Sequence, residues 1–186
     1  MIDELMFGLA NTPMETLDSF ITEEVTNHLF ENRRNSFSGM DLAALNIQRA
    51  RDHGITGYNS YREACNLTKA STFEDLKKEI PLRLIEKFRK VYDFVDDIDL
   101  FPGGLAETPV HGGIVGPTFA CIIARQFVLL KKCDRFWYEN SEPLTRFTED
   151  QLAEIRKASF ARLLCDNADD MRIIQRSALD VPEPFL

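Results

Sequence analysis

The chain has 186 residues, 44% of them hydrophobic and 28% charged, which is typical of a globular protein with room for one sizeable core. Its 30 acidic and 22 basic side chains give a net charge of −8, which disfavours nucleic acid or an anionic membrane as a partner. No apolar stretch approaches the roughly 18 residues of a membrane span, because Arg125 and Gln126 interrupt the longest one.

Almost all predicted elements are helices, with few short strands. The apolar residues of 20–30 fit partly the period of a strand and partly that of a helix, which predicts a short extended piece followed by a helical turn. Gly54 is expected to end a helix, and Gly103-Gly104 and Gly112-Gly113 to bracket an irregular segment. Helical spacing or a capping signal predicts helices over 2–10, 42–53, 58–65, 72–80, 82–95, 117–130, 148–155 and 159–165.

Three large polar side chains share one side of the helix that runs up to Gly54. Asn46, Arg49 and His53 are spaced i, i+3 and i+7, on the side that also carries Leu42 and Leu45. A guanidinium beside an apolar stripe is costly unless an anion meets it. We therefore expect this helix to face a partner that is anionic and partly apolar.

The stretch LNIQRARDHGITGYNSYREAC at 45–65 resembles the animal-type haem peroxidases, the family of myeloperoxidase, peroxidasin, chorion peroxidase and peroxinectin. Four later segments agree in order and spacing: IDLFPGGLAE, VGPTFACIIARQF, DRFWYEN and LLCDN. The resemblance implies a mainly α chain in which residues 1–186 are the C-terminal part of one peroxidase domain. It also implies that the distal His and Arg, the calcium loop and the iron-ligating proximal His all precede Met1.

The resemblance assigns roles in binding haem to four side chains. Asn46 would accept a hydrogen bond from the iron-ligating His, and Arg49 would hold a haem propionate. Leu42 and Leu45 would form part of the apolar floor on the proximal side. The residues alone leave other roles open. Asn46 could form a hydrogen bond to the backbone, and the two leucines could be ordinary core residues. Arg49 could form a salt bridge to a nearby carboxylate, such as Asp52 or Glu63.

Neither the histidines nor the aspartates of the chain are expected to bind a metal. His53 lies at a helix C-terminus beside Asp52, where the protonated ring is favoured, and a protonated ring cannot bind iron. His28 and His111 are expected at the surface. The run Asp96-Asp97-Ile98-Asp99 lacks the glycine and the glutamate of an EF-hand loop, so we expect a solvated turn there.

Four cysteines allow three complete pairings, or could all be reduced. The resemblance implies a Cys65–Cys121 disulfide, pairs Cys165 with a cysteine beyond Leu186, and assigns no partner to Cys133. Asn66-Leu67-Thr68 is a glycosylation sequon. Because family members are mostly secreted, the resemblance implies an extracellular protein with a glycan on Asn66.

The implied activity is that of a haem peroxidase, which reduces hydrogen peroxide and oxidises a halide, thiocyanate or phenolic donor. This segment would supply contacts on the proximal side of the haem and no catalytic residue, so it should be inactive alone and should depend on the N-terminal half of the domain. The alternative is a truncated or non-catalytic peroxidase-like domain that serves in adhesion or protein interaction.

Overall fold

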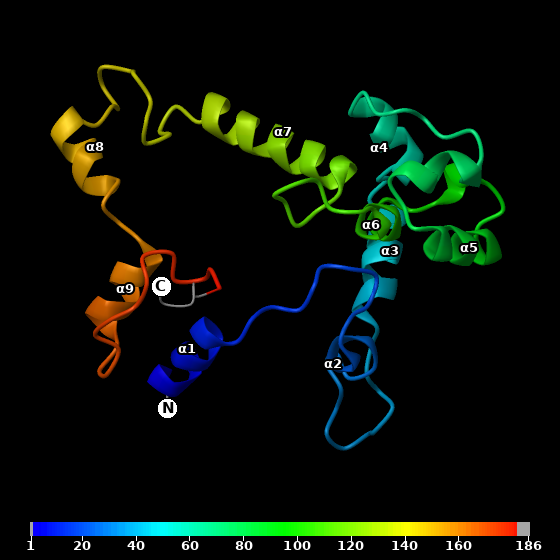
Figure 1. Ribbon diagram of the computed structural model, residues 1–186, viewed down its shortest axis with the longest axis horizontal. Helices are drawn as coiled ribbons and strands as arrows, with labels where there is room; N and C mark the ends of the chain where they lie inside the picture. The colour runs from blue at the N-terminus through cyan, green and yellow to red at the C-terminus, as the bar shows by residue number, and fades with distance from the viewer. Residues whose placement is uncertain (1, 182–186) are drawn as a thin grey trace. The chain divides into compact units, whose positions relative to one another are not determined.

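The computed structural model describes residues 2–181, which are mainly α-helical (Figure 1). Within this range no strand forms, and β-structure is confined to one antiparallel bridge between Leu29 and Met40. None of the described helices is both long and apolar enough to span a membrane. The helices are α1 (Ile2–Asn11), α2 (Glu23–Thr26), α3 (Leu42–Asp52), α4 (Tyr58–Ala64), η1 (Phe73–Lys78), α5 (Leu82–Val91), η2 (Val95–Asp97), α6 (Leu100–Ala106), α7 (Pro117–Cys133), α8 (Glu149–Ile155) and α9 (Phe160–Asn167).

The chain divides into two compact units. One is Leu17–Val128, and the other combines the described residues of the flanking segments Met1–Thr16 and Leu129–Leu186. The smaller core of the second unit joins α1 to α9 and the segment that follows it, through Met6, Ala161, Leu164 and Met171. Helices α8 and α9 begin where the sequence predicts, because Thr148 and Gln151 form a capping box and Ser159 accepts a hydrogen bond from the backbone of α9.

The core of the unit Leu17–Val128 lies among α4, η1, α5 and η2. Its most deeply buried apolar side chains are Tyr58, Leu76, Ile80, Ile85 and Ile98. Apolar residues come from one side of each short helix, so none of these helices could bury its own apolar face alone. Packing into this core therefore fixes the position of α4. Helix α6 packs against α4, and α3 packs against α6.

Helix α3 begins and ends at local signals. Asp41 precedes it, and its Oδ1 accepts a hydrogen bond of 3.1 Å from the backbone N–H of Ala44. Gly54 follows its end with φ of +69°, as the sequence predicts. None of its residues is fully buried, although the helix packs beside α6 (Figure 1). One face of α3 is therefore open.

The irregular segment expected between Gly103-Gly104 and Gly112-Gly113 starts later than predicted, after Ala106, because both Gly103 and Gly104 lie inside helix α6. A Cβ on Gly103 would overlap the ring of Tyr58, and a Cβ on Gly104 would overlap the ring of Phe119. The two glycines therefore allow two aromatic rings to press directly against the backbone of α6, and the packing offsets their poor helix propensity.

The helix predicted over 82–95 ends earlier, at Val91. Tyr92 has an extended backbone, and its hydroxyl donates a hydrogen bond of 2.8 Å to Asp99. Asp97 then accepts a hydrogen bond from the backbone N–H of Phe94 and starts the short helix η2. These side-chain hydrogen bonds compete with continuation of the helix.

Replacing Gly103 by Ala should lower the free energy of unfolding of the full-length protein. Helix propensity alone would favour Ala by about 0.5–1 kcal/mol, but overpacking against the Tyr58 ring should cost about 1–3 kcal/mol. Gly8 of α1 has no neighbouring atom where a Cβ would lie, so Gly8→Ala is the matched control and should be neutral or stabilising. Urea unfolding measures both, and a stabilised Gly103→Ala variant would contradict this packing.

Candidate functional site

The open face of α3 borders a cavity of about 430 Å³. Three polar side chains of α3 and its C-terminal cap line it: Asn46, Arg49 and His53. The other lining residues are apolar and come from α3 itself, from the segment after it, from α6 and from α7: Ala50, Ile55, Leu100, Phe101 and Phe119. The cavity thus combines cationic and amide groups with aromatic and aliphatic walls.

Arg49 presents an unpaired guanidinium at this cavity. Within residues 2–181 its side chain forms neither an ion pair nor a hydrogen bond. The two carboxylates considered as partners lie elsewhere, since Asp52 approaches His53 and Glu63 pairs with Lys69 at 3.6 Å. A guanidinium beside apolar walls and without a protein carboxylate can accept an anionic ligand.

Asn46 lies one turn before Arg49 on the same side of α3 and is half-buried. Its side-chain amide has no hydrogen-bond partner within the described part of the chain. The bond to backbone that residue type alone would favour is therefore not formed there. A half-buried amide without a partner is able to donate to or accept from a bound group.

The two leucines predicted to form an apolar floor do not line the cavity. Leu42 and Leu45 are half-buried on α3 and are not among the residues that line the cavity. Their contact with a cofactor stays a prediction. The apolar wall seen here comes instead from Leu100, Phe101 and Phe119, which lie far from α3 in sequence.

His53 caps the C-terminus of α3. Its Nδ1–H donates a hydrogen bond of 2.8 Å to the carbonyl oxygen of Arg49, and the same nitrogen lies 3.8 Å from a carboxylate oxygen of Asp52. One ring nitrogen is thus used locally, and the ring is oriented at the edge of the cavity. Its exclusion as an iron ligand stays a prediction.

The second arginine of the motif has a structural role. Arg51 donates hydrogen bonds of 2.8 and 2.7 Å to the two carboxylate oxygens of Asp99, which also accepts from Tyr92. Hydrogen bonds from Arg51, and then from Tyr92, hold the pKa of Asp99 below its usual value against the opposing effect of burial. The expectation of a solvated turn is therefore wrong for Asp99, which joins α3 to the start of α6.

A buried carboxylate positions the end of α7 that reaches the cavity. Glu107 accepts hydrogen bonds from the backbone N–H of Thr118 at 2.8 Å, from the Thr118 hydroxyl at 2.6 Å and from the Tyr58 hydroxyl at 2.7 Å. The Arg62 guanidinium, only 1% exposed, lies 3.6 Å from the same carboxylate. Since Phe119 follows Thr118, this network determines where the Phe119 ring meets the cavity.

Burial, and then the charge of Glu107, raises the pKa of the Tyr58 phenol. The phenol therefore keeps its proton, and the hydrogen bond that it donates to the carboxylate, to a more alkaline pH than an ordinary tyrosine would. Nearby, Gly116 leaves the space that the side chain of Glu107 occupies, because a Cβ at that position would overlap it.

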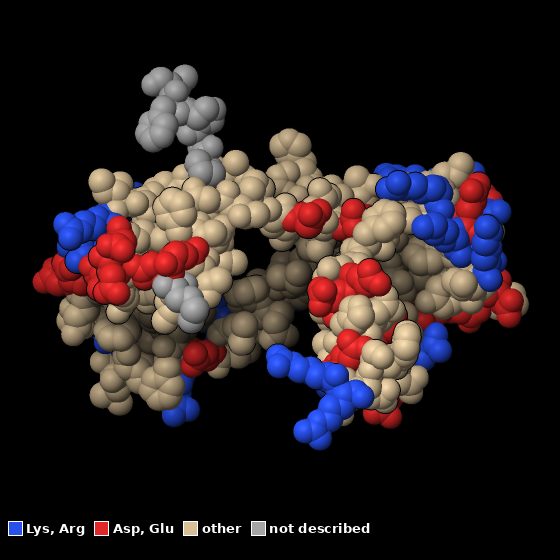
Figure 2. Space-filling view, turned by 90° about the horizontal axis from the view of Figure 1, so that it is seen from below, with Lys and Arg blue, Asp and Glu red and all other residues tan. Residues whose placement is uncertain are grey.

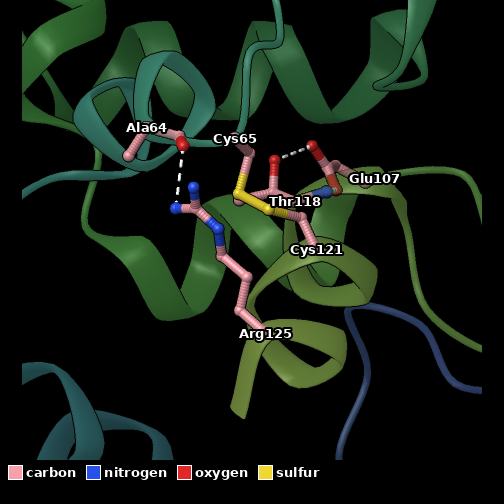
Figure 3. The surroundings of a disulfide bond; sticks show 6 residues. All are labelled: Ala64, Cys65, Glu107, Thr118, Cys121 and Arg125. Atoms are coloured by element: carbon pink, nitrogen blue, oxygen red, sulfur yellow. Dashed lines mark hydrogen bonds between the residues drawn. A yellow bond between two sulfur atoms is a disulfide. The ribbon is translucent and has the colours of Figure 1, made fainter. Parts of the chain in front are cut away.

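Two further contacts attach the same face of α7 to α4 (Figure 3). Cys121 forms a disulfide with Cys65, the pair that the family resemblance implies, and Arg125 donates a hydrogen bond of 2.9 Å to the carbonyl oxygen of Ala64. On α7, Thr118, Cys121 and Arg125 are spaced i, i+3 and i+7, which places them on one side of the helix. Cys133 and Cys165 are free thiols in this structure.

Asn66 follows the end of α4 and is exposed, with φ of +58°. Asparagine adopts this left-handed conformation more readily than most residues. Its glycosylation stays a prediction. Among residues 2–181, no three His, Cys, Asp or Glu side chains gather in a way that could hold a metal ion.

Comparison with known proteins places this chain in a family. The family model for the animal haem peroxidases matches residues 1–179. A peroxidase of Drosophila melanogaster is 43% identical over 176 residues, which are 95% of this chain and 25% of that protein. The human peroxidasin homolog is 43% identical over 179 residues, 96% of this chain and 12% of its own length.

A solved structure agrees. Peroxidase A from Dictyostelium discoideum superposes with a TM-score of 0.79 and 33% identity, covering 95% of this chain and 33% of that one. The chain therefore has the fold of the corresponding part of a haem peroxidase. It belongs to the animal haem peroxidase family, and it spans a third or less of the length of each of these three relatives.

The ion pair of Arg51 and Asp99 predicts a stability that depends on pH. Because the pKa of folded Asp99 lies below the value of about 3.9 for an unfolded aspartate, its contribution should be complete above that value and be lost as pH falls through the lower, folded-state pKa. We expect the difference in unfolding free energy between wild type and Asp99→Asn to be constant at neutral pH and to shrink below about pH 4. Arg51→Gln should weaken the same dependence, and a difference that is flat down to pH 2–3 (roughly one unit below the unfolded value) would contradict the ion pair.

Proposed function

We propose that this chain supplies the proximal side of the haem site of a peroxidase that reduces hydrogen peroxide and oxidises a halide, thiocyanate or phenolic donor. One observation carries the proposal: Arg49 and Asn46, whose side chains have no partner among residues 2–181, line a cavity with apolar walls from one side of α3, in a chain of the animal haem peroxidase family. Haem, when bound, supplies an iron that takes two oxidising equivalents from peroxide and passes them to the donor.

The chemistry of the cavity fits one edge of a haem. A haem has a flat apolar ring and two carboxylates, and the cavity offers aromatic side chains, Phe101 and Phe119, beside the unpaired guanidinium of Arg49. Carboxylates are matched by the planar fork of arginine. Arg51 is less available for this role, because its Nε and Nη2 already donate to the two carboxylate oxygens of Asp99.

Within this proposal each polar residue of α3 has a separate task. Arg49 binds a propionate and so sets the position of the ring edge. Asn46 accepts the N–H of the iron-ligating His and orients that imidazole without adding charge, whereas a carboxylate would make the imidazole more anionic. Phe101 and Phe119 exclude water from this side of the site.

The remaining parts of the site would come from the N-terminal half of the same peroxidase domain. These parts are the iron-ligating His, the distal His and Arg that act on peroxide, and a calcium site. In support, the chain matches only 25% of the Drosophila peroxidase, and Ile123 and Phe127 of α7 expose large apolar surfaces for which a larger domain would provide cover. Taken alone, the segment would be inactive. We further propose that the protein acts outside the cell and that Asn66 carries a glycan.

Arg49→Gln in the full-length protein should speed the loss of haem. Removing a charge-assisted hydrogen bond costs about 1.5–3 kcal/mol, so haem transfer to an excess of an apo-globin should become roughly 10- to 100-fold faster. Arg33→Gln makes the same change of charge at an exposed loop position and is the control. Equal transfer rates for the two variants would remove Arg49 from this role.

Asn46→Asp should lower the reduction potential of the iron in the full-length protein, because a carboxylate acceptor makes the ligating imidazole more anionic. A redox titration followed by absorption measures it, with Gln48→Glu, on an exposed position of the same helix, as the control for added charge. An unchanged potential in Asn46→Asp would contradict the proposed contact. A full-length protein that shows no Soret band after haem supplementation would favour the non-catalytic alternative instead.

A further inference from the structure

The chain concentrates positive charge in one short stretch although its net charge is −8. Residues 77–90, KKEIPLRLIEKFRK, contain six Lys or Arg and two Glu, a net charge of +4 within 14 residues. This stretch contributes nothing to the cavity beside α3. Its charge is therefore not explained by the proposed function.

Helix α5 arranges part of this charge in a row. Leu84 and Ile85 are buried against the core, so the opposite side of the helix faces solvent. On that side lie Arg83, Lys87 and Lys90, all exposed and spaced i, i+4 and i+7, which we call the basic stripe. At 1.5 Å per residue the stripe is about 10 Å long.

The cations of the basic stripe are not neutralised locally. Within residues 2–181 none of the three forms an ion pair, and Lys87 instead lies 5.7 Å from the centre of the Phe20 ring. The neighbouring Arg89 differs, because it is paired with Glu74. Glu86 is the acidic residue on the same side of α5 and offsets only one charge.

Two more exposed cations lie next to the stripe in sequence. Lys77 and Lys78 end the helix η1, which packs against α5. Figure 2 shows Lys and Arg side chains gathered on the right of the view, the side on which α5 lies in Figure 1. A cluster of exposed cations creates a positive potential that attracts anions, so this surface is suited to contact with a hydrated polyanion.

We propose that the basic stripe binds a sulfated polysaccharide. A row of cations about 10 Å long matches sulfate groups repeated along a narrow, flexible chain, and binding releases the counterions of that chain. A flat anionic membrane or a long nucleic acid would also approach the rest of the chain, which carries a net charge of −12 when the +4 of residues 77–90 is taken out of the total of −8. The choice of a polysaccharide also rests on the proposed extracellular location.

The test compares two triple variants of the full-length protein that change the net charge equally. Arg83→Gln, Lys87→Gln and Lys90→Gln remove the stripe, whereas Arg33→Gln, Arg34→Gln and Lys132→Gln remove exposed charges elsewhere. Heparin is the probe, with affinity measured by calorimetry from low salt to about 0.15 M. We expect the stripe variant to lose affinity at least about tenfold at 0.15 M and to show a shallower salt dependence, while the control variant stays close to wild type.

Three results would overturn the proposal. The first is a wild-type protein that does not bind heparin, and the second is an equal loss of affinity in both triple variants, which would indicate net charge alone. The third is tighter binding to duplex DNA or to phosphatidylserine vesicles than to heparin. Haem content and the unfolding temperature of each variant, which the stripe should not affect, separate failure of this proposal from failure of the proposed peroxidase function.

Discussion

The carboxylate of Glu107 is the contact on which the geometry around the cavity depends. A charge removed from water is costly unless hydrogen bonds and an opposite charge compensate for it. Here Tyr58 and Arg62 of α4 and Thr118 of α7 together provide that compensation. Because Thr118 lies in the first turn of α7, the carboxylate also satisfies a backbone N–H that the helix itself cannot pair, and its charge is favourable at the helix N-terminus. Helices α4, α6 and α7 thereby share one buried point of attachment.

The disulfide and Arg125 extend that attachment along α7. The disulfide Cys65–Cys121 closes a segment across a sequence separation of 56 residues, and the Arg125 side chain bonds to the end of α4 one turn further on. An attachment made of a capped helix end, a covalent bond and a hydrogen bond resists both sliding and rotation of the helix. As a result Phe119 is held against Gly104 and remains a fixed part of the cavity wall.

Two arginines of α3 have different roles, one in the packing of the protein and the other in the proposed binding of a ligand. Arg49 and Arg51 are two residues apart and so point to nearly opposite sides of α3. Arg51 is paired with Asp99 through Nε and Nη2 and stabilises the packing of α3 on the start of α6, whereas Arg49 has no partner in the described part of the chain. Charge and residue type are the same in both cases. Whether the protein itself satisfies the guanidinium is what distinguishes a structural arginine from one available to a ligand.

The sequence alone determined the helical class, most helix starts and the polar side of α3, because capping residues, Pro117, Gly54 and a period of 3.6 act over only a few neighbouring residues. Together with the family resemblance, that spacing was enough to single out Asn46 and Arg49. Helix α6 was missed because two adjacent glycines read locally as a break, and only contact with two distant rings explains them. Tertiary structure alone decided that Leu100, Phe101 and Phe119 complete the cavity, that Asp99 takes Arg51, and that Leu42 and Leu45 lie off its lining. Those outcomes depend on which residues meet after separations of about 50 to 70 positions, and no local pattern of side chains encodes such meetings.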